Sequence, residues 1–405
     1  MVNNIVSGLC FECENCINCC PTNAIRLEGQ NIFARKAVVA PESCIHCGKC
    51  EIVCPALNLN DLQRKETIAA YGVKSTDEDA QRSASGGLFF EMAKKILSES
   101  GCVAGAAYQD DWTVTTEIIS DKKDLHRLQG SKYVKSYNRD AFSKIKRRIQ
   151  SGQKVLFGGT PCQIAALYSY LGKSLRNSDQ LITADLVCHG CPPGQMFQDY
   201  IASLERKKTA KITSFQFRSQ KYGDKLVGRI GLNRNGKQRW EDLFSKESSY
   251  FSLFLDGYTY LDSCYQCPFA CKERISDFTI SDFWGWKVES RQALLDKGVK
   301  EENGVSATLI HTEKGRAFFD DLKERMIAVQ VEPECIIKHN PQLNRPSQGN
   351  LTERVTIMDA YIRNGYDDVE EYYRAKYGWK RYSLRLNCMI PTSLKNMIKK
   401  HMLHV

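Results

Sequence analysis

Apolar and polar positions along residues 83–210 alternate in a pattern that predicts strands followed by helices. In SASGGLFFEMAKKILSES, residues 83–100, the apolar positions recur at helical spacing, and Ser85 is placed to cap the helix. Short apolar runs at 102–108, 154–159 and 181–187 predict strands. Strands that alternate with helices favour right-handed crossovers, so we expect a largely parallel sheet here.

The pattern changes at Ile212. ITSFQFRS, LVGRIGLNRNGKQRWEDLF and DFTISDFWG are typical of antiparallel strands, and Asn235-Gly236 predicts a hairpin turn. GVSATLIHT and EKGRAFFDDLKERM then predict one more strand and one more helix. Beyond about residue 335 the pattern weakens. These runs predict an antiparallel subdomain within an otherwise α/β body.

Length and charge limit the class of protein. A chain of 405 residues exceeds the usual single-domain size, so we expect two or three domains. No run approaches the roughly 18 apolar residues of a membrane-spanning helix, and we find no secretory signal, so we expect a cytoplasmic protein. Of the net charge of +10, eight Lys and Arg residues and no acidic residue fall between Arg374 and Val405. The rest is nearly neutral, and we expect no nucleic-acid partner.

The cysteines supply the first candidate chemistry. Residues 10–21 and 44–55 both carry the spacing C-x2-C-x2-C-x3-C-P, which is typical of bacterial two-cluster ferredoxins. In that arrangement, three cysteines of one run and the last cysteine of the other hold each 4Fe-4S cluster. The predicted ligand sets are Cys10, Cys13 and Cys16 with Cys54, and Cys44, Cys47 and Cys50 with Cys20.

Two other uses of these cysteines are less favoured. Zinc binds C-x2-C pairs, but one zinc ion takes four ligands and has no use for two matched runs. Disulfide frameworks suit short exported domains, whereas this chain is long. Cys19 falls outside the spacing and is not expected to be a ligand.

A third metal site is suggested further along the chain. Cys162 and Cys188 follow apolar strands, at the edge where open parallel sheets gather ligands, and Cys264 and Cys267 form another C-x2-C pair. Four thiolates from these segments would suffice for a third 4Fe-4S cluster. The alternative is that the single cysteines are small buried hydrophobic residues, and spacing alone leaves both open.

Six stretches between residues 67 and about 340 carry a resemblance to a known family. They are SASGG at 83–87, LQGSKYVKS at 128–136, KVLFGGTPCQIAAL at 154–167, DLVCHG at 185–190, CYQCPFACKERISDFTISDFWG at 264–285 and GVSATLIHTEKG at 304–315. The resemblance is to the beta subunits of coenzyme F-420 (deazaflavin) hydrogenases and dehydrogenases, a family that includes the hydroxymethyl-chlorophyll reductases. It implies an FAD and a nearby 4Fe-4S cluster held by Cys162, Cys188, Cys264 and Cys267. Cys191 and Cys271 compete as ligands, and a structural role is expected for Cys102, Cys335 and Cys388.

The flavin is expected where small residues open a helix, because its pyrophosphate needs backbone amides. By resemblance, the candidates are Ser83, Ser85, Gly86, Gly87, Ser131, Lys132, Tyr133, Gly158, Gly159 and Thr160. Without the resemblance, SASGG would be interpreted as an ordinary capped helix start. Asp277 and Asp282 are expected either to bind flavin hydroxyls or to cap a turn.

Candidate catalytic residues are His189 and Lys221. Arg218, Lys221 and Tyr222, in FRSQKYGDK at 217–225, are expected to meet an anionic substrate, although this loop does not match the family's form closely. His189 is expected either to donate a proton to substrate or to bond a cluster sulfur or a backbone carbonyl.

The predicted fold is mixed, α+β and α/β, in three domains. They are a two-cluster 4Fe-4S ferredoxin domain at 1–62, an FAD and 4Fe-4S binding body at 67–340, and a helical extension at 341–405. Within the extension, PTSLKNMIKKHMLHV, residues 391–405, predicts a basic amphipathic helix. That helix would either lie weakly on the inner face of the membrane or dock on the body.

The predicted function is an iron-sulfur flavoprotein oxidoreductase. Clusters carry single electrons and a flavin exchanges two, so the chain would connect ferredoxin, or another low-potential carrier, to a two-electron small-molecule substrate. Bacterial relatives of similar length often accompany surface-polysaccharide biosynthesis genes, which suits a role there. The alternatives are an electron-transfer beta subunit of a hydrogenase or dehydrogenase complex and a zinc-binding scaffold.

Overall fold

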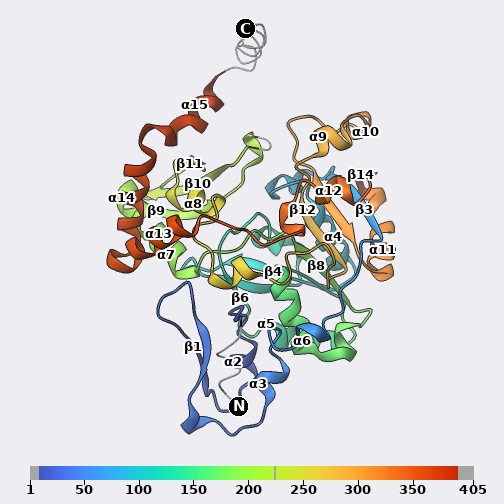
Figure 1. The fold of residues 1–405 in the computed structure, drawn as a ribbon. Coiled ribbons are helices and arrows are strands. Elements are labelled where there is room, and N and C mark those ends of the chain that lie inside the picture. Colours follow the sequence, from blue (N-terminus) through green and yellow to red (C-terminus); the bar gives the residue numbers. More distant parts are fainter. Residues whose placement is uncertain (1–8, 223–224, 391–405) are drawn as a thin grey trace. The chain divides into compact units, whose positions relative to one another are not determined.

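The apolar runs of the body form one mixed sheet of nine strands in the computed structural model, which describes residues 9–222 and 225–390 (Figure 1). The strand order is β14-β3-β13-β12-β8-β7-β4-β5-β6. The strands are β3 (Ala69–Ser75), β4 (Cys102–Tyr108), β5 (Val114–Ile119), β6 (Ser136–Tyr137), β7 (Val155–Gly159), β8 (Leu181–Leu186), β12 (Phe278–Asp282), β13 (Ser306–Ile310) and β14 (Met326–Gln330).

The centre of this sheet is parallel. β4, β7, β8 and β12 run in one direction, whereas β13, β3 and β14 are antiparallel to their neighbours. The predicted parallel arrangement of the strands at 102–108, 154–159 and 181–187 is therefore confirmed. The assignment of DFTISDFWG to the antiparallel subdomain is wrong, because β12 belongs to the large sheet, where it is parallel to β8 on one side and antiparallel to β13 on the other. A short apolar run can be buried in either kind of sheet, so its pattern does not specify its partner.

Helices cover both faces of the sheet. They are α4 (Leu88–Ser98), α5 (Ala141–Gln150), α6 (Pro161–Arg176), α9 (Trp286–Glu289), α10 (Arg291–Asp296), α11 (Glu313–Asp320) and α12 (Glu334–Ile337). Val103 and Leu156 pack in one core with α4 and α11, while their strand neighbours Ala104 and Phe157 pack in another with α5 and α6. Successive strand residues therefore feed opposite cores.

The start of α4 differs from the prediction. Gly87 is the N-cap residue and has a φ of 88°, a left-handed conformation that favours glycine. The hydroxyl of Ser85 instead donates to the carbonyl of Val305 at 2.9 Å. Ser85 is thus directed to the neighbouring strand segment, and a helix-cap role for it is wrong.

The segment that carries the first two cysteine runs is small. It contains α2 (Asn15–Cys19), the antiparallel pair β1 (Ile25–Glu28) and β2 (Lys36–Val39), and α3 (Lys49–Ile52). Its core is made by Cys16, Ala24, Ile25, Ala37 and Val39. A core of this size contributes little hydrophobic stability, so bound groups would matter to its folding.

The chain divides into two compact units, and the cysteine runs and the sheet share the first, Met1–Gln198 with Tyr260–Gln348. The second is Asp199–Thr259 with Gly349–Val405. Its elements include most of α7 (Gly194–Lys208), the antiparallel strands β9 (Lys211–Gln216), β10 (Val227–Arg234) and β11 (Lys237–Phe244), and the helices α8 (Ser249–Leu255), α13 (Leu351–Asn364), α14 (Tyr366–Tyr377) and α15 (Ser383–Met389). The predicted hairpin at Asn235-Gly236 is confirmed, with φ values of 51° and 82°.

The C-terminal segment and the helices bear on the question of membrane contact. The predicted amphipathic helix at 391–405 lies outside the described residues. Within 9–222 and 225–390, none of the helices has the length and apolar character needed to span a bilayer.

Candidate metal centres and cofactor site

The first cysteine cavity is lined by Cys10, Cys13, Cys16 and Cys54, together with apolar groups such as Phe11. Burial raises the pKa of the Cys13 thiol to about 12, and the neighbouring Cys10 and Cys54 act in the same direction. Burial likewise raises the pKa of Cys16, with Cys54 among its closest charges. The last cysteine of the second run therefore lies with three cysteines of the first.

The second cavity is lined by Cys20, Cys44, Cys47 and Cys50. Like the first cavity, it combines three cysteines of one run with the last cysteine of the other, because Cys20 comes from the first run. The thiol of Cys19 donates instead to the carbonyl of Cys16 at 3.5 Å. The structure thus gathers the two ligand sets that the spacing predicts and leaves Cys19 outside both linings.

Backbone amides face several of these sulfurs, which tests whether the cavities suit an anionic iron-sulfur group. The amide of Ala24 donates to the Cys20 sulfur at 3.3 Å. Burial acts to raise the pKa of Cys20, but the Thr22 hydroxyl and nearby amides outweigh it and lower that pKa. Amides of Asn15 and Glu51 act likewise on Cys13 and Cys50. Donors aimed at thiolates fit a 4Fe-4S cluster in each cavity.

A third set of cysteines gathers from three segments of the body. Burial raises the pKa of Cys188, and the charges next in effect are those of Cys264, Cys162 and Cys267. Cys191 joins them, since a hydrogen bond from its thiol lowers the pKa of Cys264. Within the described residues, no three Cys, His, Asp or Glu side chains converge closely enough to hold one bare metal ion.

Cys271 points elsewhere. Its sulfur contacts the guanidinium of Arg64 and lies 3.1 Å from the carbonyl oxygen of Glu273. Of the two competing cysteines, the structure therefore places Cys191 with the third set and Cys271 outside it. All 18 cysteines are free thiols.

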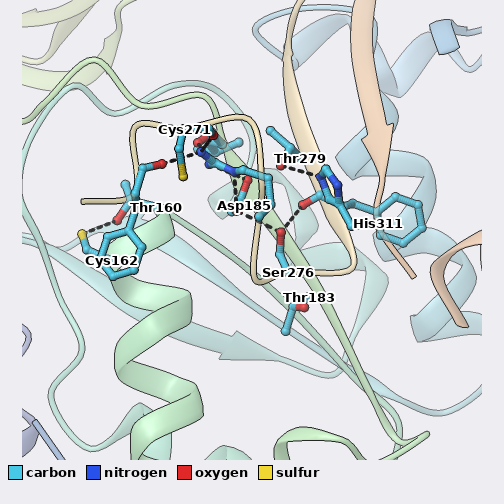
Figure 2. A network of polar contacts seen from close by, with 12 residues as sticks. Thr160, Cys162, Thr183, Asp185, Cys271, Ser276, Thr279 and His311 are labelled. Carbon is cyan, nitrogen blue, oxygen red and sulfur yellow. Dashed lines mark hydrogen bonds and ion pairs between the residues drawn. The ribbon is translucent and has the colours of Figure 1, made fainter. Parts of the chain in front are cut away.

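A buried ion pair between Arg274 and Asp185 anchors the loop that follows Cys264 and Cys267. Figure 2 shows Asp185 near Cys271 and Ser276 of this loop. Arg274 and Asp185 are 3% and 0% exposed, and their side chains meet at 2.9 Å. Arg274 also donates to the carbonyl of Phe269 at 2.7 Å, and Ser276 donates to Asp185 at 2.9 Å. The pair thereby fixes the loop to the carboxyl end of β8, next to Cys188.

The first cavity adjoins the third cysteine set through buried polar side chains that the sequence analysis missed. Lys135 donates to the carbonyl of Phe11 at 2.7 Å, and Asn138 donates to the carbonyl of Cys13 at 3.2 Å. Asn15 reaches the carbonyl of Ala166, in α6, at 2.7 Å. The only sequence signal for Lys135 is a charge set between apolar and aromatic residues in YVKSY.

Two of the predicted flavin stretches meet at the carboxyl ends of the parallel strands. Ser83, Ser85, Gly86 and Gly87 form the loop before α4, and Gly158, Gly159 and Thr160 join β7 to α6. A Cβ at Gly158 would lie 2.4 Å from the Phe89 ring, and one at Gly86 would lie 2.1 Å from the Val73 carbonyl oxygen. Close packing thus demands glycine at both positions.

The third stretch, with Ser131, Lys132 and Tyr133, lies beside the end of β4. The amine of Lys132 donates to the carbonyl of Gln129 at 2.9 Å and lies 5.7 Å from the centre of the Tyr108 ring. Burial of the amine lowers the pKa of Lys132 to about 7. The nearby Glu117 carboxylate acts in the opposite direction and partly offsets this lowering. The buried Tyr108 hydroxyl has no hydrogen-bond partner among the described residues. A cation and an orphaned hydroxyl at this edge fit an anionic, polar cofactor such as FAD.

Comparisons with known proteins agree with this geometry. Residues 152–334 match the family described as the C terminus of the coenzyme F420 hydrogenase/dehydrogenase beta subunit, and residues 9–58 match the "4Fe-4S dicluster domain". The chain is therefore similar to these beta subunits over residues 152–334 and to dicluster ferredoxin domains over residues 9–58. The resemblance predicted from the sequence is confirmed.

Two curated relatives match parts of the chain. The F subunit of the F(420)H(2) dehydrogenase of Methanosarcina mazei is 24% identical over 178 residues, covering 40% of this chain and 48% of that protein. An uncharacterized ferredoxin of Methanocaldococcus jannaschii is 41% identical over 44 residues, covering 11% of this chain and 64% of the ferredoxin. The chain therefore spans about half to two thirds of the length of these relatives.

One solved structure is also similar. It is titled "Xenon derivatization of the F420-reducing [NiFe] hydrogenase complex from Methanosarcina barkeri", and the matched chain is 13% identical. The match covers 74% of this chain and 94% of that chain, with a TM-score of 0.43. A likeness at this level carries no argument about fold or function.

The two aspartates predicted as flavin candidates lie at opposite ends of β12. Asp282 ends the strand, at the same edge as the flavin stretches, and its charge acts on His189. Asp277 precedes the strand at the other edge, where it is 2% exposed and accepts hydrogen bonds from Thr183 and Thr312 at 2.9 and 2.8 Å. The structure thus does not bring Asp277 together with the other flavin candidates.

The two predicted catalytic residues lie in different units. His189 follows Cys188 and is exposed, yet the protein around its ring lowers its pKa, with Asp282 acting in the opposite direction. Lys221 belongs to the second unit, where its amine pairs with Asp242 at 2.8 Å. The Tyr222 hydroxyl binds the same carboxylate at 2.6 Å. Arg218, Lys221 and Tyr222 therefore belong to the second unit, whereas the cysteine sets belong to the first.

Proposed function

We propose that this chain is an iron-sulfur flavoprotein that exchanges single electrons between three 4Fe-4S clusters and a two-electron substrate at FAD. The observation that carries the proposal is the gathering of three cysteine sets in one compact unit, the third beside the predicted flavin loops. The match of residues 9–58 to a dicluster domain supports the first two clusters.

Named residues would hold each group. The ferredoxin clusters would take the two cavity sets, and the body cluster Cys162, Cys188, Cys264 and Cys267. The loops at 83–87 and 158–160 would present backbone amides to the FAD pyrophosphate, and Lys132 would supply a charge. When bound, the clusters carry one electron at a time and the flavin exchanges two, so together they suit conversion between one-electron and two-electron reactions.

The structure also suggests the order of the sites. The first cavity adjoins the body through Lys135, Asn138 and Asn15. The second cavity reaches the surface, where Cys47 is exposed and Ile45 is 62% exposed. We therefore propose that a ferredoxin, or another low-potential carrier, docks at the second cavity, while the first connects it to the body.

His189 is the proposed proton donor to the reduced substrate. It follows Cys188 in the chain, and the charge of Asp282, at the carboxyl end of β12, acts on it. Its lowered pKa makes the imidazolium a stronger acid, so a ring protonated from solvent would give that proton to the reduced substrate more readily. Lys221 is the second proposed catalytic residue.

A second candidate function is an electron-transfer subunit of a larger complex. The observation in its favour is that the M. mazei relative is named as a subunit of a dehydrogenase. This candidate uses the same clusters and flavin but takes its substrate specificity from a partner. Cytoplasmic location and a role in polysaccharide biosynthesis stay predictions under either candidate.

An anaerobic optical titration tests the proposal and separates the two candidates. The purified chain is treated in turn with dithionite, reduced deazaflavin and reduced nicotinamide while cluster and flavin absorption are followed. We expect dithionite to bleach both. Bleaching of the flavin by a two-electron donor with the chain alone supports a stand-alone oxidoreductase, and bleaching only after a partner is added supports the second candidate. Absence of flavin absorption would contradict the FAD part of the proposal.

Binding of FAD should depend on pH through Lys132. A bound pyrophosphate favours the charged amine, whose pKa in the free protein is about 7, so the affinity should fall by about tenfold per pH unit above pH 7. Burial raises the pKa of Tyr108, so its hydroxyl does not titrate in this range. Fluorescence titration of flavin-free protein with FAD measures the dissociation constant.

The control for this prediction is a lysine replacement that keeps the charge. Lys132→Arg should bind FAD with a nearly flat pH profile, because a guanidinium stays charged. Lys132→Met should also be flat but roughly tenfold or more weaker, since a charged hydrogen bond is lost. A steep profile that persists in Lys132→Arg would show that another group is responsible.

A further inference from the structure

Lys135 is a buried lysine placed between two cysteine sets. Its side chain is held by the carbonyl of Phe11, the residue after Cys10, at 2.7 Å, and its backbone amide by the carbonyl of Pro192, the residue after Cys191, at 2.9 Å. It is only 4% exposed. The residue thus connects the first cavity to the third cysteine set by both its main chain and its side chain.

The titratable groups around Lys135 are mostly cysteine side chains. The groups that act on it most strongly are Cys162, Cys191, Glu12 and Cys13, and they raise its pKa even though burial alone would lower it. Glu12 is already neutralised by Arg35, whose guanidinium lies 2.6 Å from it. The positive charge of Lys135 is therefore not neutralised by Glu12 alone. It acts on cysteines of both sets, Cys13 in the first and Cys162 and Cys191 in the third.

We propose that Lys135 is a positioning and tuning residue, a fixed cation that favours the reduced state of the two clusters it separates. The inference rests on the proposed function. Reduction adds one electron to a cluster and changes no bond, so a nearby buried cation stabilises the reduced form and raises the reduction potential. The described groups that act most strongly on Lys135 do not include Cys20, Cys44, Cys47 or Cys50, so this cation should not affect the cluster that those four cysteines would hold.

Redox titration of the full-length, iron-loaded protein, followed by electron paramagnetic resonance, tests this. In Lys135→Met we expect two of the three clusters to become harder to reduce, by at least tenfold in the reduction equilibrium, which is about 59 mV for a one-electron couple. The cluster of Cys20, Cys44, Cys47 and Cys50 should keep its potential and serves as an internal control. Lys135→Arg should restore all three.

Two further variants separate charge from structure. Lys135→Gln keeps a donor near the Phe11 carbonyl without the charge, so it should behave like Lys135→Met. Lys95→Met removes another buried lysine, 7% exposed, whose partners are the carboxylates Glu99 and Asp321, and it should leave every potential unchanged. If Lys135→Met does not retain iron, the Gln and Arg variants supply the comparison.

The outcomes are distinct. Unchanged potentials in Lys135→Met or Lys135→Gln, at wild-type iron content, would overturn the inference and leave the proposed function intact. A shift of all three clusters would also overturn it, because a local charge cannot act equally on the outer cluster. A wild-type protein without reducible clusters would overturn the proposed function, and this inference with it.

Discussion

Replacement of Arg274 by Met should lower the free energy of unfolding of the first unit by about 3–5 kcal/mol, because it leaves the buried Asp185 carboxylate uncompensated. Both side chains are almost completely inaccessible to solvent, at 3% and 0% exposed. Arg274 also donates to the carbonyls of Phe269 and Cys271, so the loop that follows Cys264 and Cys267 would lose its anchor as well. Anaerobic urea unfolding of the iron-loaded protein measures the loss.

Two comparisons make this result specific. Arg291→Met removes an arginine that pairs with Glu301 while 50% exposed, and it should cost only about 0–1 kcal/mol. The double variant Arg274→Met, Asp185→Leu removes both buried charges and should recover much of the loss. If Arg274→Met costs no more than Arg291→Met, the ion pair does not anchor the loop as described.

Replacement of Cys188 by Ala should remove the body cluster and leave the two ferredoxin clusters in place. A 4Fe-4S cluster held by three thiolates is weakly retained, so we expect the iron content to fall from about twelve to about eight per chain. Cys271→Ala is the matched control from the same neighbourhood. Its sulfur is directed to Arg64 and to the carbonyl of Glu273, so this variant should keep all of its iron.

The structure also makes Cys191 a test of this ligand set. Cys191 lies with the third set and bonds the Cys264 sulfur. We expect Cys191→Ala to keep the body cluster, with Cys162, Cys188, Cys264 and Cys267 as ligands. Loss of about four irons in Cys191→Ala but not in Cys188→Ala would show that Cys191, and not Cys188, is the ligand of the body cluster.

The grouping of the first two cysteine sets around two cavities could be predicted from the sequence because most of that information is local. In the first two runs, short x2 spacings wrap the chain around one face of a cluster, and only the last cysteine of each run has to come from elsewhere. The hairpin at Asn235-Gly236 is local in the same sense, since two residues with positive φ determine it. Such local features do not depend on contacts with distant segments of the chain.

Other features depend on contacts between distant segments and have no local signal. The partner of Lys135 is Phe11, 124 residues away, and nothing in YVKSY indicates it. Asp277 precedes β12 and Asp282 ends it. The direction of that strand in the sheet decides which of the two lies at the edge that carries the predicted flavin stretches. The same strand was assigned to the wrong sheet because an apolar run does not specify its neighbours.

The iron and acid-labile sulfide content of the wild-type protein, purified without air, tests the central claim most directly. Three 4Fe-4S clusters predict about twelve irons and about twelve sulfides per chain, with little zinc. A protein that contains stoichiometric zinc and no sulfide, or that is colourless and free of iron, would contradict the account.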